Sequence, residues 1–476
     1  MDKVELKSAI CRAIDHKREG IIGVGEAIMD RPELGFKEWK TADRVCAVFD
    51  ELGLPYERDL ALTGVKARLK GKGVGPTVAL MGELDALIVP DHPRADLSTG
   101  AAHACGHNAQ IAGLLGAAYG LVESSASSYL AGDVIFFAVP AEEYVEIEYR
   151  RELVREGKTT FLAGKPELVQ LGFFDDVDMA IMIHSSSPEH ADGAMGVASS
   201  SNGFLAKTVA FVGKAAHAGE GAEKGINALN AAQLALSAIN AQRETFRDQD
   251  CVRVHPIITK GGDLVNIIPS EVRMETYVRA RTQEAIFDAE VKVDRALKGA
   301  AYAMGCSVEI ETVPGYMPLR NSPKLRELFK ENAGGIWGPE EYRDYPHGGG
   351  STDAGDLSQI MPVLHPAMTG AKGVIHGSDW EIADFNAGYL APAKTMATMV
   401  IDLLVDGQAE EILRCEKPAM TKEEYLEKQR GIFRSEHFNE GEVPTSVMAN
   451  DFLTTYKYGW KTSYYQNTYD VKTDEV

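Results

Sequence analysis

The stretch TVALMGELD (77–85) decides the fold, because it joins a short apolar run to two carboxylates. The run DVIFFAV (133–139) has the same form and leads into PAEE, and the run DMAIMI (178–183) leads into His184. Runs this short and this apolar are typical of strands that are buried on both faces of a parallel sheet. Helical patterns lie between them, so the chain is predicted to form βαβ units and an α/β fold.

Polar residues follow each of these three runs directly. They are Glu83, Asp85, Glu142, Glu143 and His184. In open α/β sheets, ligands bind beyond the carboxyl ends of the strands. We therefore expect the polar chemistry of this protein to collect along one edge of the sheet.

The middle of the chain shows a different order of predicted strands and helices. Strands are expected at 204–213, 252–261, 271–280 and 306–313, and helices at 227–244 and 284–305. The order strand, helix, two strands, helix, strand is the ferredoxin-like arrangement. The pattern predicts a complete small domain that is inserted into a larger one.

The chain is therefore expected to have four parts. Residues 1–200 form the first part of a catalytic domain, residues 201–314 the inserted domain, and residues 315–415 the second catalytic part. Residues 416–476 form a charged, tyrosine-rich C-terminal extension, which could pack on the body or on a neighbouring subunit. A helical excursion at 144–169 lies next to the expected site.

Bulk properties exclude several classes of protein. The net charge of −21 argues against a nucleic-acid surface, because phosphate neutralisation needs clustered lysine and arginine. No apolar run approaches the ~20 residues of a membrane helix, so no membrane partner is expected. The six cysteines lie far apart, which is not the dense pattern of a secreted disulfide scaffold. We predict a cytoplasmic protein.

The segment HACGHN (103–108) carries the first candidate ligands. Cys105 and His107 can converge in a turn, and thiolate and imidazole are good ligands for zinc-like ions. The pair Glu142–Glu143 offers a division of labour, in which one carboxylate binds metal and its neighbour moves protons.

Further ligands are expected at the next strand ends. His184 and His376 would add imidazoles, and Asp85 would bind metal or orient a ligand. A rival hypothesis makes Cys105 a nucleophile with a histidine base, but it leaves the two glutamates without a task.

The glycine-rich segment GGGSTDAGDLS (348–358) has two interpretations. It could be a phosphate-binding loop, but it lacks the Lys-Ser/Thr ending of a P-loop. We interpret it as a loop that leads into a helix capped by Ser351, Thr352 or Asp353.

A set of motifs in order along the chain resembles a known family. These motifs are RPELGFKEWKTA (31–42), HACGHN (103–108), PAEE (140–143), His184, GKAAHAG (213–219), GGDLVNIIPSEVRMETYVRA (261–280) and GSTDAGDLS (350–358). Together they resemble the M20 metallopeptidase family. The likeness is to its amidohydrolase branch of aminoacylases, hippurate hydrolases and auxin-conjugate hydrolases. Within that branch the spelling is most similar to the p-aminobenzoyl-glutamate hydrolase group and related dipeptide-cleaving members. Asn108 stands where most of the branch has Asp.

The resemblance implies a role for each matching residue. Two divalent metal ions, zinc or manganese, would be held by Cys105, His107, Glu143, His184 and His376, with His365 as a competing candidate for the last position. The implied catalytic residues are Glu142 as general base and later proton donor, Asp85 beside the metals, and His217, which would reach the active site of a partner subunit. The implied substrate-binding residues are Asn266, Arg279, Gly349, Gly350 and Ser351.

The resemblance also implies the architecture and the assembly. It implies a zinc-peptidase-type α/β catalytic domain, with a mixed sheet flanked by helices, and an inserted ferredoxin-like dimerisation domain. A homodimer or a higher homo-oligomer through the inserted domain is therefore expected.

The hypothesis from sequence is a metal-dependent amidohydrolase. Its substrate would be an N-acyl or N-aroyl amino acid such as p-aminobenzoyl-glutamate, or a small dipeptide. The alternatives are a catalytically inactive small-molecule or metal-binding protein on the same fold, and a Cys105-nucleophile amidase. The intact Glu142 argues against a pure binding protein, which needs no proton shuttle beside its metal.

Overall fold

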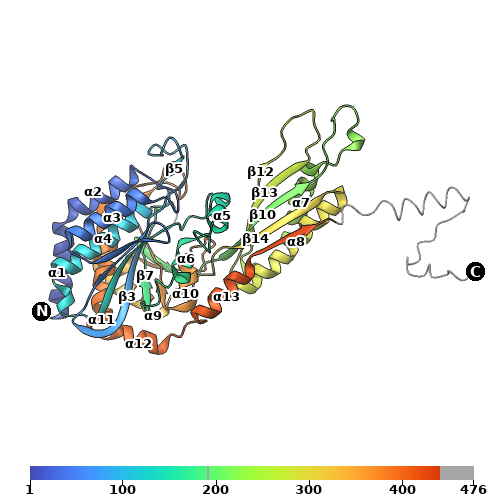
Figure 1. Cartoon of the computed structure of the whole chain (residues 1–476). Helices are drawn as coiled ribbons and strands as arrows, with labels where there is room; N and C mark the ends of the chain where they lie inside the picture. The colour runs from blue at the N-terminus through green and yellow to red at the C-terminus, as the bar shows by residue number, and fades with distance from the viewer. Residues whose placement is uncertain (190–191, 440–476) are drawn as a thin grey trace, which may run out of the picture.

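The computed structural model describes residues 1–189 and 192–439, and Figure 1 shows a large α/β body with a smaller domain projecting from it. The body is built on a sheet in the order β1-β2-β6-β3-β7-β16. These strands are β1 (Tyr56–Leu60), β2 (Gly64–Leu69), β3 (Gly73–Glu83), β6 (Ala131–Val139), β7 (Met179–Ile181) and β16 (Val363–Leu364). β3 pairs in parallel with β6 and β7, whereas β2 runs antiparallel to β6. The predicted parallel core strands are thus confirmed within a mixed sheet.

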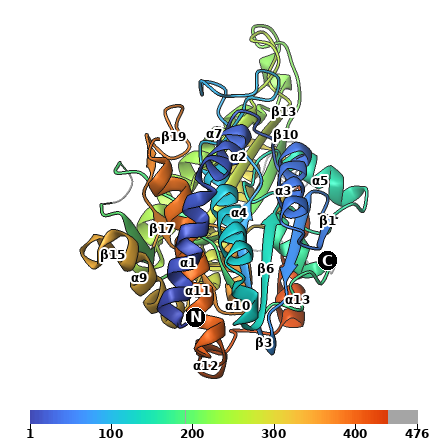
Figure 2. The same cartoon turned by 90° about the vertical axis from the view of Figure 1, so that its left-hand side faces the viewer.

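Helices cover both faces of this sheet. One face carries α1 (Lys3–His16), α2 (Arg18–Met29), α3 (Trp39–Glu51), α4 (His107–Glu123) and α11 (Ala391–Val405), with α9 (Pro323–Trp337) and α12 (Gln408–Cys415) beside α11. The other face carries α6 (Gly164–Gln170), α10 (Ala354–Ile360) and α13 (Lys422–Ile432), and α5 (Ile147–Arg155) precedes α6. The turned view in Figure 2 shows α1, α4 and α11 lying side by side.

Helix α4 explains how the sequence places the first ligands. Its residues from His107 to Leu121 are buried all round, as expected for a helix that is enclosed on every side. It begins immediately after Gly106, whose φ of 87° and close approach to Ser185 leave no room for a side chain. The turn at Gly106 therefore brings Cys105 and His107 together at the start of the helix.

The projecting domain has the predicted ferredoxin-like order. It consists of β10 (Gly203–Val212), α7 (Ala228–Ala241), β11 (Arg253–Val254), β12 (Ile257–Lys260), β13 (Glu271–Ala280), α8 (Gln283–Met304) and β14 (Ser307–Pro314). All of its strand pairs are antiparallel, and the helices bury a separate apolar core against one face. The fold class is thus confirmed. The boundaries at 201 and 314 stay a prediction.

One predicted strand is interrupted. The sequence pattern predicts a single strand over residues 252–261, but they form β11 and β12, which pair separately with β13. Pro256 lies between them and has no N–H to donate to the neighbouring strand, so the ladder breaks there.

The described part of the C-terminal extension contacts both domains. α13 packs on the catalytic body, and β20 (Arg434–Phe438) then pairs antiparallel with β14 of the inserted domain. The extension to residue 439 thus packs on its own chain. The tyrosine-rich stretch beyond it lies outside the described residues.

Small sheets complete the body around the expected site. β15 (Tyr342–Tyr345), β9 (Met195–Ala198), β17 (Ala367–Met368) and β8 (His184–Ser185) form one of them. Two-stranded sheets pair β4 (Leu87–Ile88) with β5 (Ala101–Ala102), and β18 (Ala371–Lys372) with β19 (Glu381–Ile382). Across the described residues, no helix has the length and apolar character needed to span a membrane.

Candidate active site

The candidate ligands come from several segments that meet at one edge of the central sheet. Cys105 and His107 stand at the start of α4, and Glu142 and Glu143 follow β6. His184 opens β8, which follows β7 after two residues. The expectation that polar residues gather beyond the strand ends is therefore met.

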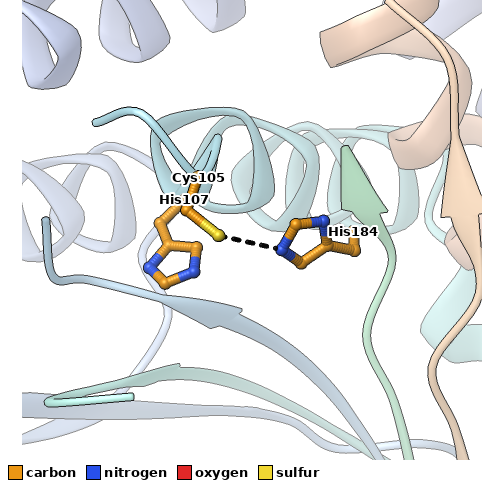
Figure 3. A group of neighbouring side chains, drawn as sticks. All are labelled: Cys105, His107 and His184. Carbon is orange, nitrogen blue, oxygen red and sulfur yellow. Dashed lines mark hydrogen bonds between the residues drawn. The ribbon is translucent and has the colours of Figure 1, made fainter. Parts of the chain in front are cut away.

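Cys105, His107 and His184 form a first group of donor atoms. The atoms that they offer lie within 4.8 Å of one another, and Cys105 Sγ is 3.3 Å from His184 Nε2. Figure 3 shows the thiol and the His184 ring turned toward each other, with His107 beside them. The i and i+2 positions at the start of the helix thus converge, as the sequence suggested.

A second group shares the same thiol. Cys105, Glu143 and His376 also offer atoms within 4.8 Å, and His376 Nε2 lies 3.4 Å from Glu143 Oε1. His376 lies in the loop between β18 and β19, and its backbone N donates to Ala104 O at 2.8 Å. This hydrogen bond ties the loop to the segment that carries Cys105.

Unpaired buried atoms at the centre show that the group fits metal ions. His107 Nδ1 lies 2.9 Å from Asp85 O, so that nitrogen carries a proton and Nε2 is the ring nitrogen left for a metal ion. His107 Nε2 and Glu143 Oε1 are among the buried side-chain atoms of the described residues that lack a hydrogen-bond partner. Buried polar atoms are otherwise almost always paired. A thiolate, imidazoles and a carboxylate together suit zinc or manganese.

Two of these donors, Cys105 and Glu143, carry the negative charge that a cation needs. Burial and Glu143 raise the pKa of Cys105, but His184 and His107 outweigh them and bring it down to about 6. Burial also opposes ionisation of Glu143, yet His376 brings the pKa of that carboxyl down to about 2. Both groups are therefore anionic near neutral pH, which is the form that coordinates metal.

Glu142 behaves differently from its neighbour. Burial raises its pKa well above the usual value, and Glu83 and Glu143 raise it further by repulsion. Its Oε2 lies 4.0 Å from His107 Nε2, beside the ligands but facing the cavity. A carboxyl with a raised pKa next to candidate ligands is suited to accept and return a proton.

Asp85 lies behind the ligands and connects two of them. Its Oδ2 accepts a hydrogen bond from Glu143 N at 2.8 Å, and its backbone O faces His107 Nδ1. It is fully buried and does not line the cavity. Asp85 thus contacts two candidate ligands from the side away from the cavity.

A cavity of about 690 Å³ opens in front of the donor groups. Gly349, Gly350 and Ser351 line it, as does Arg279 of β13 in the inserted domain. Arg279 Nη1 donates to Ser351 Oγ at 3.2 Å, while its buried Nε lacks a partner within the described part of the chain. The guanidinium thus has hydrogen-bonding capacity to spare inside the cavity.

His217 and Asn266 are not brought to this cavity. Both are exposed and lie next to each other, with Ala218 N donating to Asn266 O at 2.9 Å. His217 Nδ1 accepts from Glu220 N at 2.9 Å, which leaves its Nε2–H directed outward. Within one chain, these two residues are therefore apart from the other candidates.

His365 lines the cavity but joins none of the three donor groups among the described residues. Burial, and then the nearby His184, lower its pKa to about 3, so this imidazole is neutral. His376 is the residue that lies with Cys105 and Glu143, which favours it as the last ligand. Asn108 leads into α4 as expected and donates to Tyr389 Oη at 3.1 Å.

Sequence reasoning assigned no role to several buried charged residues behind the site. Glu83 forms a third donor group with His107 and Glu142, and Lys165 of α6 forms an ion pair with it. Arg150 of α5 donates to the backbone oxygens of Ala141 and Glu143. The sequence places Glu83 at the end of an apolar run, where a functional carboxylate is expected. By contrast, nothing in the pattern of residues 144–169 predicts that Arg150 and Lys165 are buried.

Asp353 also departs from its expected role. It occupies the N-cap position of α10, but its side chain makes no capping hydrogen bond and pairs with Lys165 instead. The buried ammonium competes for the carboxylate, and Thr352 Oγ1 accepts from Ala354 N at 3.2 Å in its place.

Comparison with known proteins identifies the family of this chain. Residues 79–400 match the family model of peptidase family M20/M25/M40. The Xaa-Arg dipeptidase of Mus musculus is 29% identical over 449 residues, covering 88% of this chain and 94% of the mouse protein.

Two solved structures share the fold. A dinuclear metal binding peptidase of the M20 family from Bacillus subtilis has a TM-score of 0.61 and 22% identity, covering 82% of this chain and 99% of that one. An aminobenzoyl-glutamate utilization protein from Klebsiella pneumoniae has a TM-score of 0.59 and 20% identity, covering 82% and 97%. With the family match over most of the chain and the donor groups at the strand ends, this chain belongs to peptidase family M20/M25/M40 and is a metal-dependent peptidase or amidohydrolase.

Proposed function

We propose that this enzyme hydrolyses the amide bond of an N-acyl or N-aroyl amino acid, p-aminobenzoyl-glutamate among them, or of a small dipeptide. The observation that carries the proposal is the position of Glu142. It lies 4.0 Å from His107 of one donor group and lines the cavity that contains Arg279. The similarity to an Xaa-Arg dipeptidase and to an aminobenzoyl-glutamate utilization protein supports amide substrates of this size.

Two divalent ions, zinc or manganese, are proposed as cofactors. Cys105, His107 and His184 would hold one, and Cys105, Glu143 and His376 the other. When bound, such ions polarise an amide carbonyl and lower the pKa of a water molecule. The Bacillus subtilis neighbour is a dinuclear metal binding peptidase, which supports a pair of ions in this fold.

Side chains of the protein would transfer the protons and bind the carbonyl oxygen. Glu142 takes one proton from the attacking water as the new C–O bond forms. It then gives this proton to the nitrogen of the leaving amine as the C–N bond breaks, so that an acid and an amine result. His217 of a partner subunit would hydrogen-bond the carbonyl oxygen, and Asn266 would lie beside it.

Arg279 would bind the carboxylate of the substrate, since a guanidinium matches a carboxylate with two parallel hydrogen bonds. Apart from Glu142 and Glu143, no acidic residue lines the cavity among the described residues. A basic side chain on the substrate would find no partner there. We therefore expect neutral or acidic amino-acid products in preference to arginine.

Turnover of a small amide panel tests this function. Purified enzyme is loaded with Zn²⁺ or Mn²⁺ and given p-aminobenzoyl-glutamate, hippurate and Xaa-Arg dipeptides, and the released amine is measured. We expect hydrolysis of the first two, loss of activity on chelation and recovery when metal returns. Failure to cleave any amide of the panel, with metal bound, would contradict the proposed function.

A Cys105→Ser variant separates the metal hypothesis from the nucleophile hypothesis. If Cys105 is a shared ligand, the variant loses bound metal together with turnover, because serine is a far poorer zinc ligand. If Cys105 is the nucleophile, the variant keeps its metal content and loses turnover alone. Metal content after dialysis decides between them.

A further inference from the structure

Lys165 lies at the back of the site and bridges two carboxylates. It is completely buried near the start of α6, with its Nζ 2.6 Å from Glu83 Oε1 and also paired with Asp353. Its backbone N donates to Asp353 Oδ2 at 3.0 Å. Burial alone would lower its pKa, but Asp353 and Glu83 outweigh burial and keep the lysine charged.

Glu83 is the partner on the ligand side. It ends β3, and its Oε2 lies 3.1 Å from His107 Nε2, the nitrogen that faces the other donors. Gln110 Nε2 donates to the same oxygen at 2.7 Å. Glu83 thus lies within reach of a cation at His107, and Lys165 holds its other oxygen.

Asp353 is the partner on the substrate side. It directly follows the cavity-lining segment from Gly349 to Thr352 and stands at the start of α10. α6 and α10 lie against each other, as Figure 1 also shows. The position of Asp353 therefore affects the loop that carries Ser351, which accepts a hydrogen bond from Arg279.

We propose that Lys165 is a positioning residue for the reaction, which ties the ligand-bearing end of β3 to the substrate-lining loop before α10. The inference rests on the proposed function and deepens it. The ammonium of Lys165 neutralises the charge of Glu83. This carboxylate can then face His107 without competing with Glu143 for a metal ion or with Glu142 for a proton. Without the ammonium, Glu83 is a buried anion free to turn to the nearest cation, which would be a bound metal ion.

Lys207 offers a matched control elsewhere in the fold. It is likewise completely buried, and its Nζ lies 2.8 Å from Glu290 Oε1 and 2.8 Å from Asp294 Oδ1. It lies on β10 in the core of the inserted domain and does not line the cavity. Both lysines are buried ion-pair centres, but only Lys165 is connected to the ligands.

The experiment compares Lys165→Met with Lys207→Met. For each, metal content after dialysis, the visible spectrum of the Co²⁺ form, kcat and KM are measured beside the wild type. We expect Lys165→Met to lose about 10- to 100-fold in metal affinity or kcat, with a changed thiolate–Co²⁺ absorption band. Lys207→Met is expected to lower the unfolding temperature while its spectrum, metal content and kcat stay at wild-type values.

The same Co²⁺ spectrum, metal content and kcat in the two variants would overturn the proposal, because Lys165 would then contribute only to stability. If Lys165→Met does not fold, Lys165→Gln carries the same comparison, since its amide keeps two hydrogen-bond donors and removes the charge. Metal content and spectrum need no substrate. If the wild type binds metal but cleaves no amide, the proposed function is wrong. The metal content and Co²⁺ spectrum of the Lys165 and Lys207 variants still test the positioning role in that case.

Discussion

At the scale of single residues, the two adjacent glutamates differ because their surroundings differ. Glu143 faces His376, which lowers its pKa, while Glu142 is buried beside Glu83 and Glu143, which raise its own. Glu143 is thereby kept anionic, as its proposed metal coordination requires, and Glu142 is made a stronger base, as its proposed proton transfer requires. Identical side chains thus acquire different proton affinities through their neighbours alone.

Replacement of Glu142 by Gln tests the proton role. The amide has the same shape but cannot take a proton from water, so we expect kcat to fall by about 10²- to 10⁴-fold. Metal content should stay at the wild-type level, because Glu142 belongs to neither of the two groups that share Cys105. Steady-state kinetics and metal analysis measure both. Full activity in this variant would exclude Glu142 as the general base.

The backbone is also unusual at the site. His376 has a φ of 65° and Ala141, one residue before Glu142, has a φ of 54°. Residues with side chains rarely adopt this left-handed conformation, and it persists only where the surroundings impose it. Arg150, which donates to Ala141 O, and Glu38, which accepts from Ala141 N, impose it at PAEE.

At the scale of elements, helix α13 is anchored to the back of α10. Asp356 of α10 is completely buried and accepts hydrogen bonds from Tyr425 Oη and Gln429 Nε2 of α13. Burial, with repulsion from Asp353, raises the pKa of Asp356 to about 8. The C-terminal extension is therefore joined to the helix that follows the substrate-lining loop.

The raised pKa of Asp356 implies that the stability of the protein depends on pH. From its usual pKa, about 4, up to about 8, the folded chain keeps a proton on Asp356 that the unfolded chain releases, so rising pH favours unfolding. Asp356→Asn removes that proton. We expect its free energy of unfolding to improve relative to the wild type by up to about 1.4 kcal/mol per pH unit between pH 5 and pH 7.

Denaturant unfolding of both proteins at several pH values measures this difference. A constant difference across that range would mean that Asp356 has an ordinary pKa in the folded protein. Above pH 8 both states of the wild type are ionised at this position, and the difference should level off.

At the scale of the whole molecule, one edge of the sheet of the inserted domain is unpaired among the described residues. β20 covers β14 on one side, while Ile257 and Ile258 of β12 on the other side are exposed. Leu264 and Val265, in the loop beside Asn266, are exposed as well, Val265 completely. Apolar side chains gathered at a free sheet edge favour a partner there. This agrees with the proposed homodimer, in which His217 serves the site of the other subunit.

Mixed dimers test that assembly. His217→Ala and Glu142→Gln should each be nearly inactive alone. When the two are unfolded and refolded together, each mixed dimer has one site with an intact Glu142 and a His217 supplied by its partner. We expect recovery of about a quarter of the wild-type activity, measured per total protein. No recovery on mixing, with dimers present by light scattering, would place His217 outside the partner's site.

The sequence by itself determined the chemistry and the order of the elements. Cys105, His107, Glu143 and His184 are recognisable because they follow short apolar runs, and strand ends in an α/β sheet must converge. The inserted domain is recognisable because local periodicity distinguishes its strands from its helices. These signals are local, so one sequence suffices to read them.

Only the tertiary structure decided which charges lie behind the site and which histidine joins it. His365 and His376 look equivalent along the chain, but only His376 meets Cys105 and Glu143. Lys165 looks like any surface lysine until α6 packs against α10 and encloses it with Glu83. Contacts between residues so distant in sequence depend on how the helices pack, and no local pattern encodes that packing.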